Sequence, residues 1–199
     1  MMPGDRTRRR ARRRMAACIA AVAASAAVAA PQTYVIDPAH TTPLFEVRHM
    51  GMSLQRGFFT NTTGTIVLDR AERRGSIDVV IGTGSVVTGS RVMTDVLKRE
   101  DFFNADKFPA MRFVSRDLAF DGDVPVAATG ELTLLDVARP VVLKIADFTC
   151  GAQIYTRRPM CAAEATATIR RSEFGMTYGI PRVAGDEVRI VIPVEAFQE

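Results

Sequence analysis

From Tyr34 to the C-terminus the sequence alternates apolar and polar residues with a period of two, and this pattern constrains the fold most strongly. Successive side chains of a β-strand point to opposite faces, so the alternation predicts strands with one buried and one solvated face. Turn residues recur at intervals of about 8 to 15 positions, as an all-β sandwich or barrel requires. We therefore predict an all-β fold in a single domain.

About eight strands can be placed from this pattern. The first carries Phe45, Val47 and His49 on one face. The others are expected near residues 57–68, 76–83, 110–120, 125–135, 140–149, 161–171 and 187–197. Eight antiparallel strands suit an up-and-down barrel that is filled by side chains or holds one small ligand. Both a solid apolar core and an open cavity satisfy the pattern.

One segment, residues 89–104, departs from the period of two. Apolar residues recur there at spacings of three and four, which favours an amphipathic helix. They are Val92, Met93, Val96, Leu97 and Phe103. Pro109 then returns the chain to an extended conformation. We expect one short helix, over about residues 89–104, near an end of the barrel.

The first 29 residues have the pattern of a secretory signal peptide. Seven arginines lie among the first 14 residues, and an uncharged block rich in Ala and Val runs from residue 15 to 28. Small residues, Ala27 and Ala29, follow where a signal peptidase cleaves. The leader predicts a domain of residues 30–199 in the periplasm or outside the cell. A mitochondrial transit peptide is the alternative, although it would spread its arginines along an amphipathic helix.

The net charge argues against a nucleic-acid partner once the leader is removed. The full chain carries 26 basic and 22 acidic residues, a formal charge of +4. Seven arginines and Asp5 belong to the leader, which leaves 19 basic and 21 acidic residues and a net charge of −2. A protein that binds the phosphate backbone needs a basic surface. We therefore expect no binding to nucleic acid.

The domain retains an even pair of cysteines, Cys150 and Cys161, since Cys18 lies in the leader. Disulfides persist in exported proteins, so the pair predicts a disulfide. Its members lie 11 positions apart and could join the two strands of a hairpin. Closing so short a loop stabilises a fold by about 3 kcal/mol in the chain-entropy model. Two buried free thiols are the alternative.

The sequence offers few groups for catalysis or metal binding. It contains two histidines, His40 and His49, and lacks the motifs of a nucleophile elbow, a dinucleotide site and a P-loop. The one metal site that we can compose joins both histidines with Asp37 or Glu46, and we predict no metal. We expect no enzyme, no catalytic residue and no cofactor, so binding is the function class that remains.

Seven short motifs follow one another along the domain and cover nearly all of it. They are Tyr34-x-Ile36-Asp37-x-x-His40, Phe45-x-Val47-x-His49-Met50-Gly51, Gly57-x-Phe59, Leu97-Lys98-x-x-Asp101-Phe102-Phe103-Asn104-Ala105, Phe108-Pro109, Gly130-x-Leu132-Thr133-Leu134 and Arg171-Ser172-Glu173-Phe174-Gly175-Met176. In this order and spacing the chain resembles the YceI-like family of secreted bacterial polyisoprenoid-binding proteins.

The resemblance implies a lipocalin-like antiparallel β-barrel whose lumen holds a long isoprenoid chain, of the quinone or polyprenyl phosphate type. The implied function is a periplasmic carrier or reservoir for that lipid. It also implies which residues form the wall and mouth of the lumen. These are Phe45, Val47, His49, Phe59, Phe102, Phe103, Phe108, Phe113, Phe174 and Met176. Three residues of the same motifs, Asp37, His40 and Arg171, could instead hold the barrel end together.

A second hypothesis uses the same fold for a different role. The protein would then be a secreted stress-response or interaction protein that binds a fatty acyl amphiphile or uses the barrel structurally. The resemblance also allows a homodimer and a transient contact with a membrane. The two hypotheses differ in whether an isoprenoid lipid survives purification.

Overall fold

The computed structural model describes residues 30–199, which form eleven strands, one α-helix and two 3₁₀ helices. The strands are β1 (Gln32–Ile36), β2 (Leu44–His49), β3 (Ser53–Phe59), β4 (Thr62–Asp69), β5 (Arg74–Gly82), β6 (Val86–Thr88), β7 (Ala110–Asp121), β8 (Val124–Leu134), β9 (Val137–Ala152), β10 (Pro159–Arg170) and β11 (Ala184–Gln198). The helices are η1 (Thr83–Ser85), α1 (Arg91–Leu97) and η2 (Arg171–Phe174). The predicted signal peptide, residues 1–29, lies outside the described residues.

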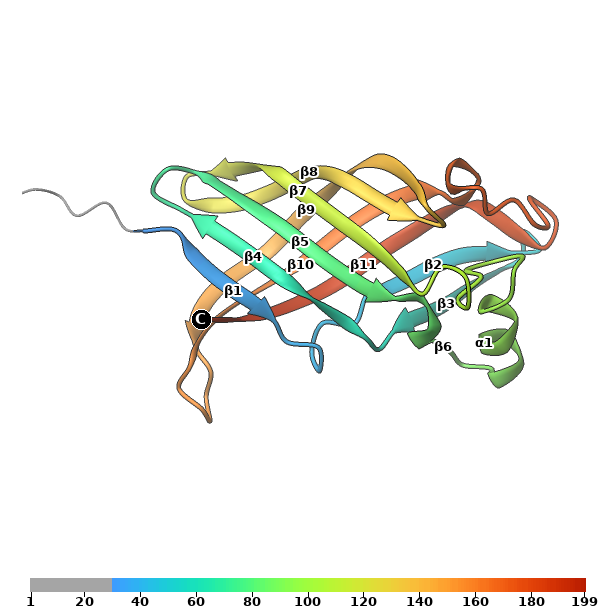
Figure 1. The fold of residues 1–199 in the computed structure, drawn as a ribbon, viewed down its shortest axis with the longest axis horizontal. Helices are drawn as coiled ribbons and strands as arrows, with labels where there is room; N and C mark the ends of the chain where they lie inside the picture. The colour runs from blue at the N-terminus through green and yellow to red at the C-terminus, as the bar shows by residue number, and fades with distance from the viewer. Residues whose placement is uncertain (1–29) are drawn as a thin grey trace, which may run out of the picture.

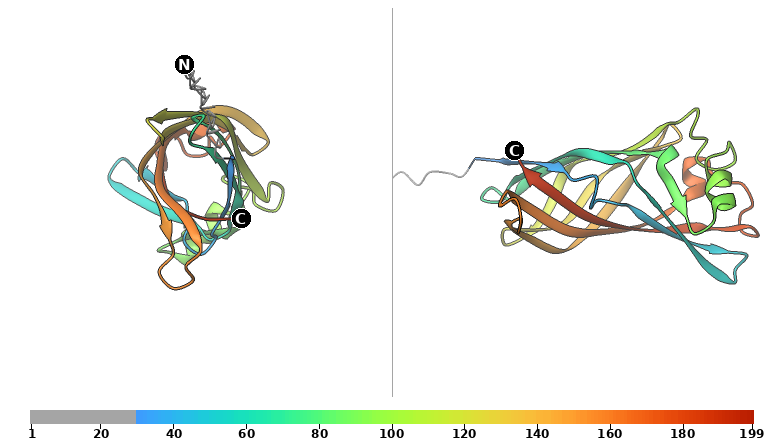
Figure 2. Two further views of the ribbon diagram at one scale, coloured as in Figure 1. Left: turned by 90° about the vertical axis from the view of Figure 1, so that its left-hand side faces the viewer. Right: turned by 90° about the horizontal axis from the view of Figure 1, so that it is seen from below.

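The strands form an antiparallel barrel that closes on itself (Figures 1 and 2). Eight of them make a ring in the order β1-β4-β5-β7-β8-β9-β10-β11, because β11 pairs with β1 as well as with β10. The closing register sets Tyr34 opposite Gln198 and Ile36 opposite Ala196. Closure leaves this ring without an unpaired edge. The prediction of an antiparallel barrel of about eight strands is confirmed.

Three further strands lengthen the barrel wall at the end near α1. β2 pairs with the first half of β11, β3 pairs with β2, and β6 pairs with β3. The strand predicted over residues 57–68 is therefore wrong in extent, since it is divided into β3 and β4. At the division the backbone N–H groups of Thr60 and Asn61 donate to the carbonyl and hydroxyl oxygens of Ser85 rather than to a neighbouring strand.

A bulge in β7 keeps apolar residues inside along its whole length. Ser115 pairs with Gly130 while Asp117 pairs with Thr129, so Arg116 is an extra residue in the ladder. The Ser115 hydroxyl donates to the Thr129 carbonyl at 2.7 Å and accepts from the Asp117 N–H at 3.2 Å. The extra residue shifts the inward parity by one position. The strand can therefore present buried side chains to the interior on both sides of the bulge.

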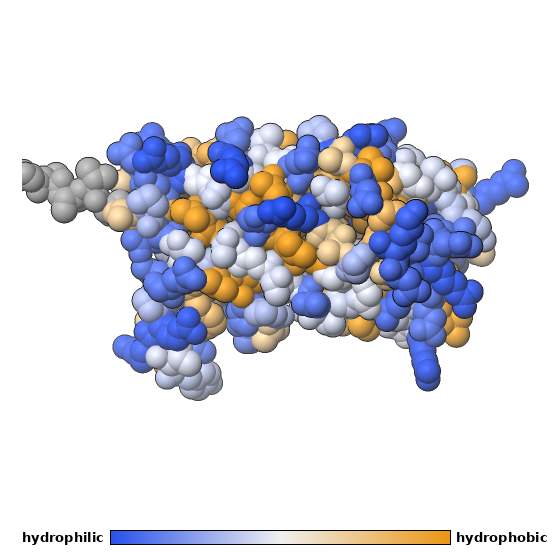
Figure 3. Space-filling model, in the orientation of Figure 1, coloured by the Kyte–Doolittle hydropathy of each residue, from blue (hydrophilic) through white to orange (hydrophobic). Residues whose placement is uncertain are grey.

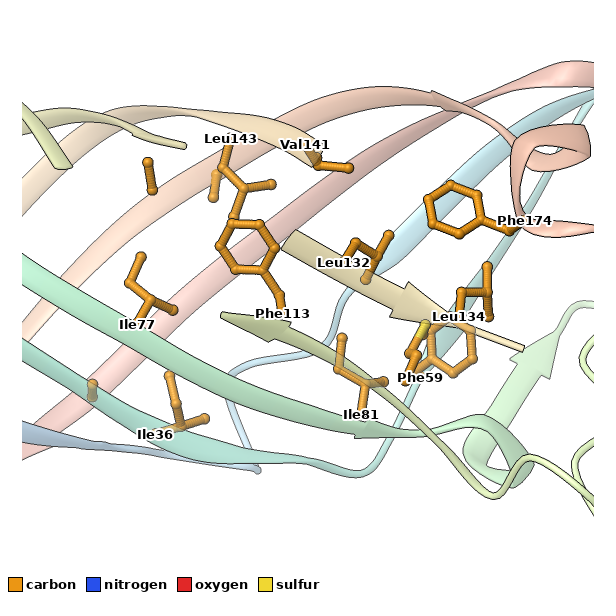
Figure 4. Close-up of a cluster of buried hydrophobic side chains, with 14 of the residues drawn as sticks. Ile36, Phe59, Ile77, Ile81, Phe113, Leu132, Leu134, Val141, Leu143 and Phe174 are labelled. Carbon is orange, nitrogen blue, oxygen red and sulfur yellow. The ribbon is translucent and has the colours of Figure 1, made fainter. Parts of the chain in front are cut away.

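The interior contains apolar side chains from facing strands, which point toward one another (Figure 4). Those labelled in the figure are Ile36, Phe59, Ile77, Ile81, Phe113, Leu132, Leu134, Val141, Leu143 and Phe174, all of them buried. On the outer face in view, hydrophilic residues gather toward both ends and apolar residues are exposed mainly in the middle of the wall (Figure 3). The period of two predicted the apolar inner face of the strands, whereas the exposed apolar residues in the middle of the outer wall depart from it.

The predicted helix is present near a barrel end, but it is shorter than residues 89–104. It begins after Ser90, whose side chain accepts a hydrogen bond from the Met93 N–H, and it ends at Leu97. The chain then forms turns that place Phe102 and Phe103 in the core. Spacings of three and four fit this buried turn as well as a helix, which explains the error. No helix within residues 30–199 has the length and apolar character to cross a membrane.

Cys150 and Cys161 form a disulfide, as predicted, and they face each other in the register of β9 and β10. Their Cα atoms lie 4.0 Å apart. Cys150 is exposed, whereas Cys161 is buried. The bond closes the base of a hairpin whose turn projects from the barrel (Figures 1 and 2).

We predict that Cys150→Ser lowers the free energy of unfolding by about 3 kcal/mol, because it releases a short loop in the unfolded chain. Chemical denaturation should detect this loss under oxidising conditions. In the presence of a thiol reductant, the variant and the unsubstituted protein should have equal stability. A loss of the same size with and without reductant would contradict the prediction.

Candidate ligand-binding cavity

A cavity of about 230 Å³ lies inside the barrel. Every strand of the closed ring contributes to its wall. Examples in ring order are Tyr34, Ile66, Ile77, Phe113, Leu132, Leu143, Ala165 and Ile192. The wall includes Leu118 of β7 and Phe148 of β9 and reaches Leu97, the last residue of α1. An apolar cavity of about 150 Å³ in another protein takes up benzene and excludes water. The space here is large enough for an apolar ligand.

Polar groups are scarce on this wall. Among the described residues that line the cavity, Arg171 alone is charged, and Tyr34, Thr41 and Thr62 carry hydroxyl groups. The Thr41 hydroxyl is satisfied, because it donates to the Glu195 carbonyl at 3.1 Å and accepts from the Glu195 N–H at 3.0 Å. Thr62 is fully buried, and its Oγ1 has no hydrogen-bond partner within residues 30–199. One unsatisfied hydroxyl therefore lies beside an apolar cavity.

Arg171 stabilises the barrel end near α1. Its side chain is 3% exposed, and its guanidinium donates four hydrogen bonds to backbone carbonyls. The acceptors are Gly185, Met176, Tyr178 and Ala184, at 2.8, 3.0, 2.9 and 2.9 Å. Burial lowers the pKa of Arg171 from its ordinary value, against the opposing effect of the Asp186 charge. These bonds tie the segment after η2 to the start of β11, so Arg171 holds this end together.

Aromatic rings form the wall beside α1. The centroid of the Phe59 ring lies 5.3 Å from that of Phe103 and 6.0 Å from that of Phe45. Gly57 makes room for the Phe45 ring, since a Cβ atom at position 57 would lie 2.4 Å from its Cζ. Phe102 stacks edge-on against Tyr178, with centroids 5.6 Å apart. The cavity is thus bounded by rings at the end that Arg171 stabilises.

Seven of the ten residues predicted for the lumen line the cavity. They are Phe45, Val47, Phe59, Phe102, Phe103, Phe113 and Met176. For these seven, contact with a ligand stays a prediction. The prediction missed most of the wall, for which the signal was the inward parity of residues such as Leu132 and Leu134 or Val141 and Leu143.

The other three predicted residues do not line the cavity. His49 ends β2 and pairs with Ser53 at the hairpin turn, beyond the enclosed part of the barrel. Phe108 lies under the Lys107 ammonium group, 5.0 Å from the ring centroid. Phe174 is buried, but it belongs to η2 and packs in the core without reaching the cavity wall.

An ionisable cluster lies on the surface at the turn between β1 and β2. The Nδ1 atom of His40 lies 2.6 Å from Asp37 Oδ2 and 3.8 Å from Glu195 Oε2. The hydrogen bond to Asp37, together with the charges of Glu195 and Asp37, raises the pKa of His40. Desolvation raises the pKa of Asp37, but the hydrogen bonds from His40 and the Ala39 N–H and the His40 charge outweigh it, so this pKa is lowered.

This cluster differs from the metal site that the sequence could compose. The ligand atoms of Asp37, His40 and Glu195 lie within 4.8 Å of one another, but no such group within residues 30–199 contains both histidines. Glu46 instead receives hydrogen bonds from Arg56 at 2.6 Å and from Arg189 at 2.9 Å. The ion pairs of His40 with Asp37 and with Glu195 thus join the turn after β1 to β11.

Comparison with known proteins finds a family model and several related structures. Residues 34–196 match the model of the YceI-like domain. A UPF0312 protein of Shewanella denitrificans is 38% identical over 114 residues, which are 56% of this chain and 60% of that protein. The chain thus spans less than two thirds of that relative's length.

Two solved structures share the fold. The crystal structure of BcnA from Burkholderia cenocepacia matches with a TM-score of 0.68 at 24% identity, over 80% of this chain and 98% of that one. A polyisoprenoid binding domain from Saccharophagus degradans, implicated in plant cell wall breakdown, matches with a TM-score of 0.63 at 16% identity, over 83% of this chain and 98% of that one. At these identities the likeness establishes the barrel fold.

We predict that Thr62→Val raises the free energy of unfolding of the ligand-free protein by about 1 kcal/mol, because it removes an unsatisfied buried hydroxyl of similar shape. Thr41→Val is the matched control and should lower stability by about 1 to 2 kcal/mol, because it leaves the Glu195 N–H without its partner. Chemical denaturation measures both changes. Destabilisation by Thr62→Val would mean that the hydroxyl has a hydrogen-bond partner in solution.

We predict that the His40 cluster makes stability depend on pH. The pKa of His40 is raised in the folded state above its ordinary value of 6.5, so its contribution is complete below that pH and is lost as pH rises through the folded pKa. The melting temperature should therefore fall as pH rises above the ordinary pKa of 6.5, and the fall should be smaller in His40→Gln. His49→Gln serves as the control and should keep the full decrease. An unchanged decrease in His40→Gln would refute the assignment.

Proposed function

This chain belongs to the YceI-like family, and we propose that it is an exported carrier that holds a long-chain isoprenoid lipid in its barrel. The apolar cavity is the observation that carries the proposal. Its wall comes from all eight strands of the ring and includes one charged side chain among the described residues, Arg171. A hydrocarbon chain gains about 0.8 kcal/mol for each CH₂ that it buries, without polar partners.

The choice of an isoprenoid, of the quinone or polyprenyl phosphate type, draws on the family and on one neighbour. The Saccharophagus degradans domain described as polyisoprenoid binding has the same barrel fold. The wall here is built from branched aliphatic and aromatic side chains, which pack against a methyl-branched chain. The Thr62 hydroxyl is fully buried behind this wall, so the surface that the ligand meets is apolar.

The polar groups on the wall support binding rather than catalysis. Four carbonyls already engage the guanidinium of Arg171, and the ionisable cluster around His40 lies on the surface. Action in the periplasm or outside the cell is supported by the leader predicted over residues 1–29 and by the Cys150–Cys161 disulfide, a bond that persists in oxidising compartments.

We predict that Val47→Arg abolishes retention of the lipid, because it places a charge on the apolar wall. Val142→Arg is the control, since Val142 is 53% exposed and does not line the cavity. Lipid that remains with the purified variants should be measured by extraction and mass spectrometry, with folding checked by circular dichroism. Equal retention in both folded variants would show that Val47 does not contact the lipid.

Native mass spectrometry, with organic extraction of the protein purified from its own host, tests the function itself. The proposal requires one isoprenoid lipid in stoichiometric amount. A fatty acyl amphiphile in its place would favour the alternative of a stress-response or interaction protein. An empty protein that also refuses added quinones and polyprenyl phosphates would overturn the carrier function and leave the barrel with a structural role.

A further inference from the structure

The turn between β9 and β10 carries two of the most exposed apolar side chains of the molecule. Ile154 is 79% exposed and Tyr155 is 88% exposed, the highest values among the large hydrophobic residues of the described chain. Arg157 and Arg158 follow after Thr156 and are also exposed. We call residues 154–158 the basic tip. Apolar side chains that are exposed beside cations are typical of a site that binds a partner with both an apolar and an anionic part.

The basic tip is held in a defined conformation. The Gln153 side-chain oxygen accepts hydrogen bonds from the backbone N–H groups of Tyr155 at 2.7 Å and Thr156 at 2.6 Å. The Gln153 N–H donates to the Arg158 carbonyl oxygen, and the Arg157 N–H donates to the Gln153 carbonyl oxygen, both at 2.9 Å. The disulfide between β9 and β10 closes the hairpin below these bonds. The apolar side chains are thus presented outward by a braced turn.

The arginines of the tip are available to an anionic partner. No carboxylate within residues 30–199 forms an ion pair with Arg157 or Arg158 within 4.0 Å. The Arg158 guanidinium lies 4.6 Å from the centroid of the Phe197 ring, which orients it and leaves it exposed. Tyrosine at the headgroup level, an aliphatic anchor and unpaired arginines are the combination that binds anionic membrane surfaces.

The tip also lies at an end of the barrel where the cavity wall begins. The hairpin projects beside the C-terminus (Figures 1 and 2), and Phe148, Cys161 and Ala162 near its base line the cavity. At the opposite end, aromatic rings and Arg171 bound the cavity. We propose that the basic tip docks the protein on a bilayer that contains anionic phospholipid, with Ile154 and Tyr155 in the interface and both arginines on lipid phosphates.

Tryptophan fluorescence provides a direct test, because the chain contains no tryptophan. Tyr155→Trp introduces a single reporter at the tip. Met52→Trp is the matched control, since Met52 is 78% exposed on the β2–β3 turn near α1. The protein, purified as its host processes it, is mixed with vesicles of phosphatidylglycerol and phosphatidylcholine in equal parts. We expect a blue shift and quenching by brominated lipid for position 155 alone.

A second measurement separates the role of the arginines from that of the apolar pair. Arg157→Gln with Arg158→Gln should weaken binding to the same vesicles about thirtyfold, at about 1 kcal/mol for each cation. Ile154→Ser with Tyr155→Ser should also release the protein, whereas Met52→Ser should not. Unchanged melting temperatures exclude unfolding as the cause.

Three outcomes would overturn the proposal. They are the absence of any spectral shift at position 155, an equal shift at position 52, and equal binding to vesicles of phosphatidylcholine alone. These results would leave the carrier function untouched, since lipid retention in the cavity is measured separately on the purified protein. A protein that lacks isoprenoid but still binds the vesicles would keep the docking surface and reject the carrier.

Discussion

The pairing of β1 with β11 is the interaction on which the rest of the structure depends. It joins three residue pairs between the two ends of the domain, among them Tyr34 with Gln198. Without it the strands would form an open sheet with one face to cover. With it, the inward faces of eight strands enclose a space, and their apolar side chains form the wall of a cavity inside the ring. The proposed function therefore rests on ring closure as much as on any single side chain.

The fold could be predicted from the sequence where one rule governed many residues. The period of two predicted most of the strands and an apolar inward face for them, although it placed no strand at β1 or β6. It failed where local contacts replaced the ladder, as at Thr60 and Asn61, which bond to Ser85. It also failed at Phe102 and Phe103, whose spacing fits a helix although they belong to a buried turn.

The candidate site was predicted in part, and for a related reason. Aromatic residues in the motifs indicated the wall beside α1, but the aliphatic wall formed by β9 to β11 carries no motif, and only the alternation of inward and outward residues identifies it. The role of Arg171 depends on backbone carbonyls from both sides of a loop, which only the fold brings together. Whether the Thr62 hydroxyl has a hydrogen-bond partner likewise depends on the residues that the fold places around it. The basic tip illustrates the same limit, because a turn sequence does not reveal how far its residues project.

Ring closure also sets the order in which the molecule can fold. β1 is the first strand of the domain and β11, of 15 residues, is the last, so the contact that completes the barrel joins residues 160 to 164 positions apart in the chain. Contacts of such high sequence separation form late and slowly. The barrel therefore stays open until the residues of β11 have been synthesised. That delay is consistent with the export that we propose above, because a barrel that has not closed can still pass through a secretion channel.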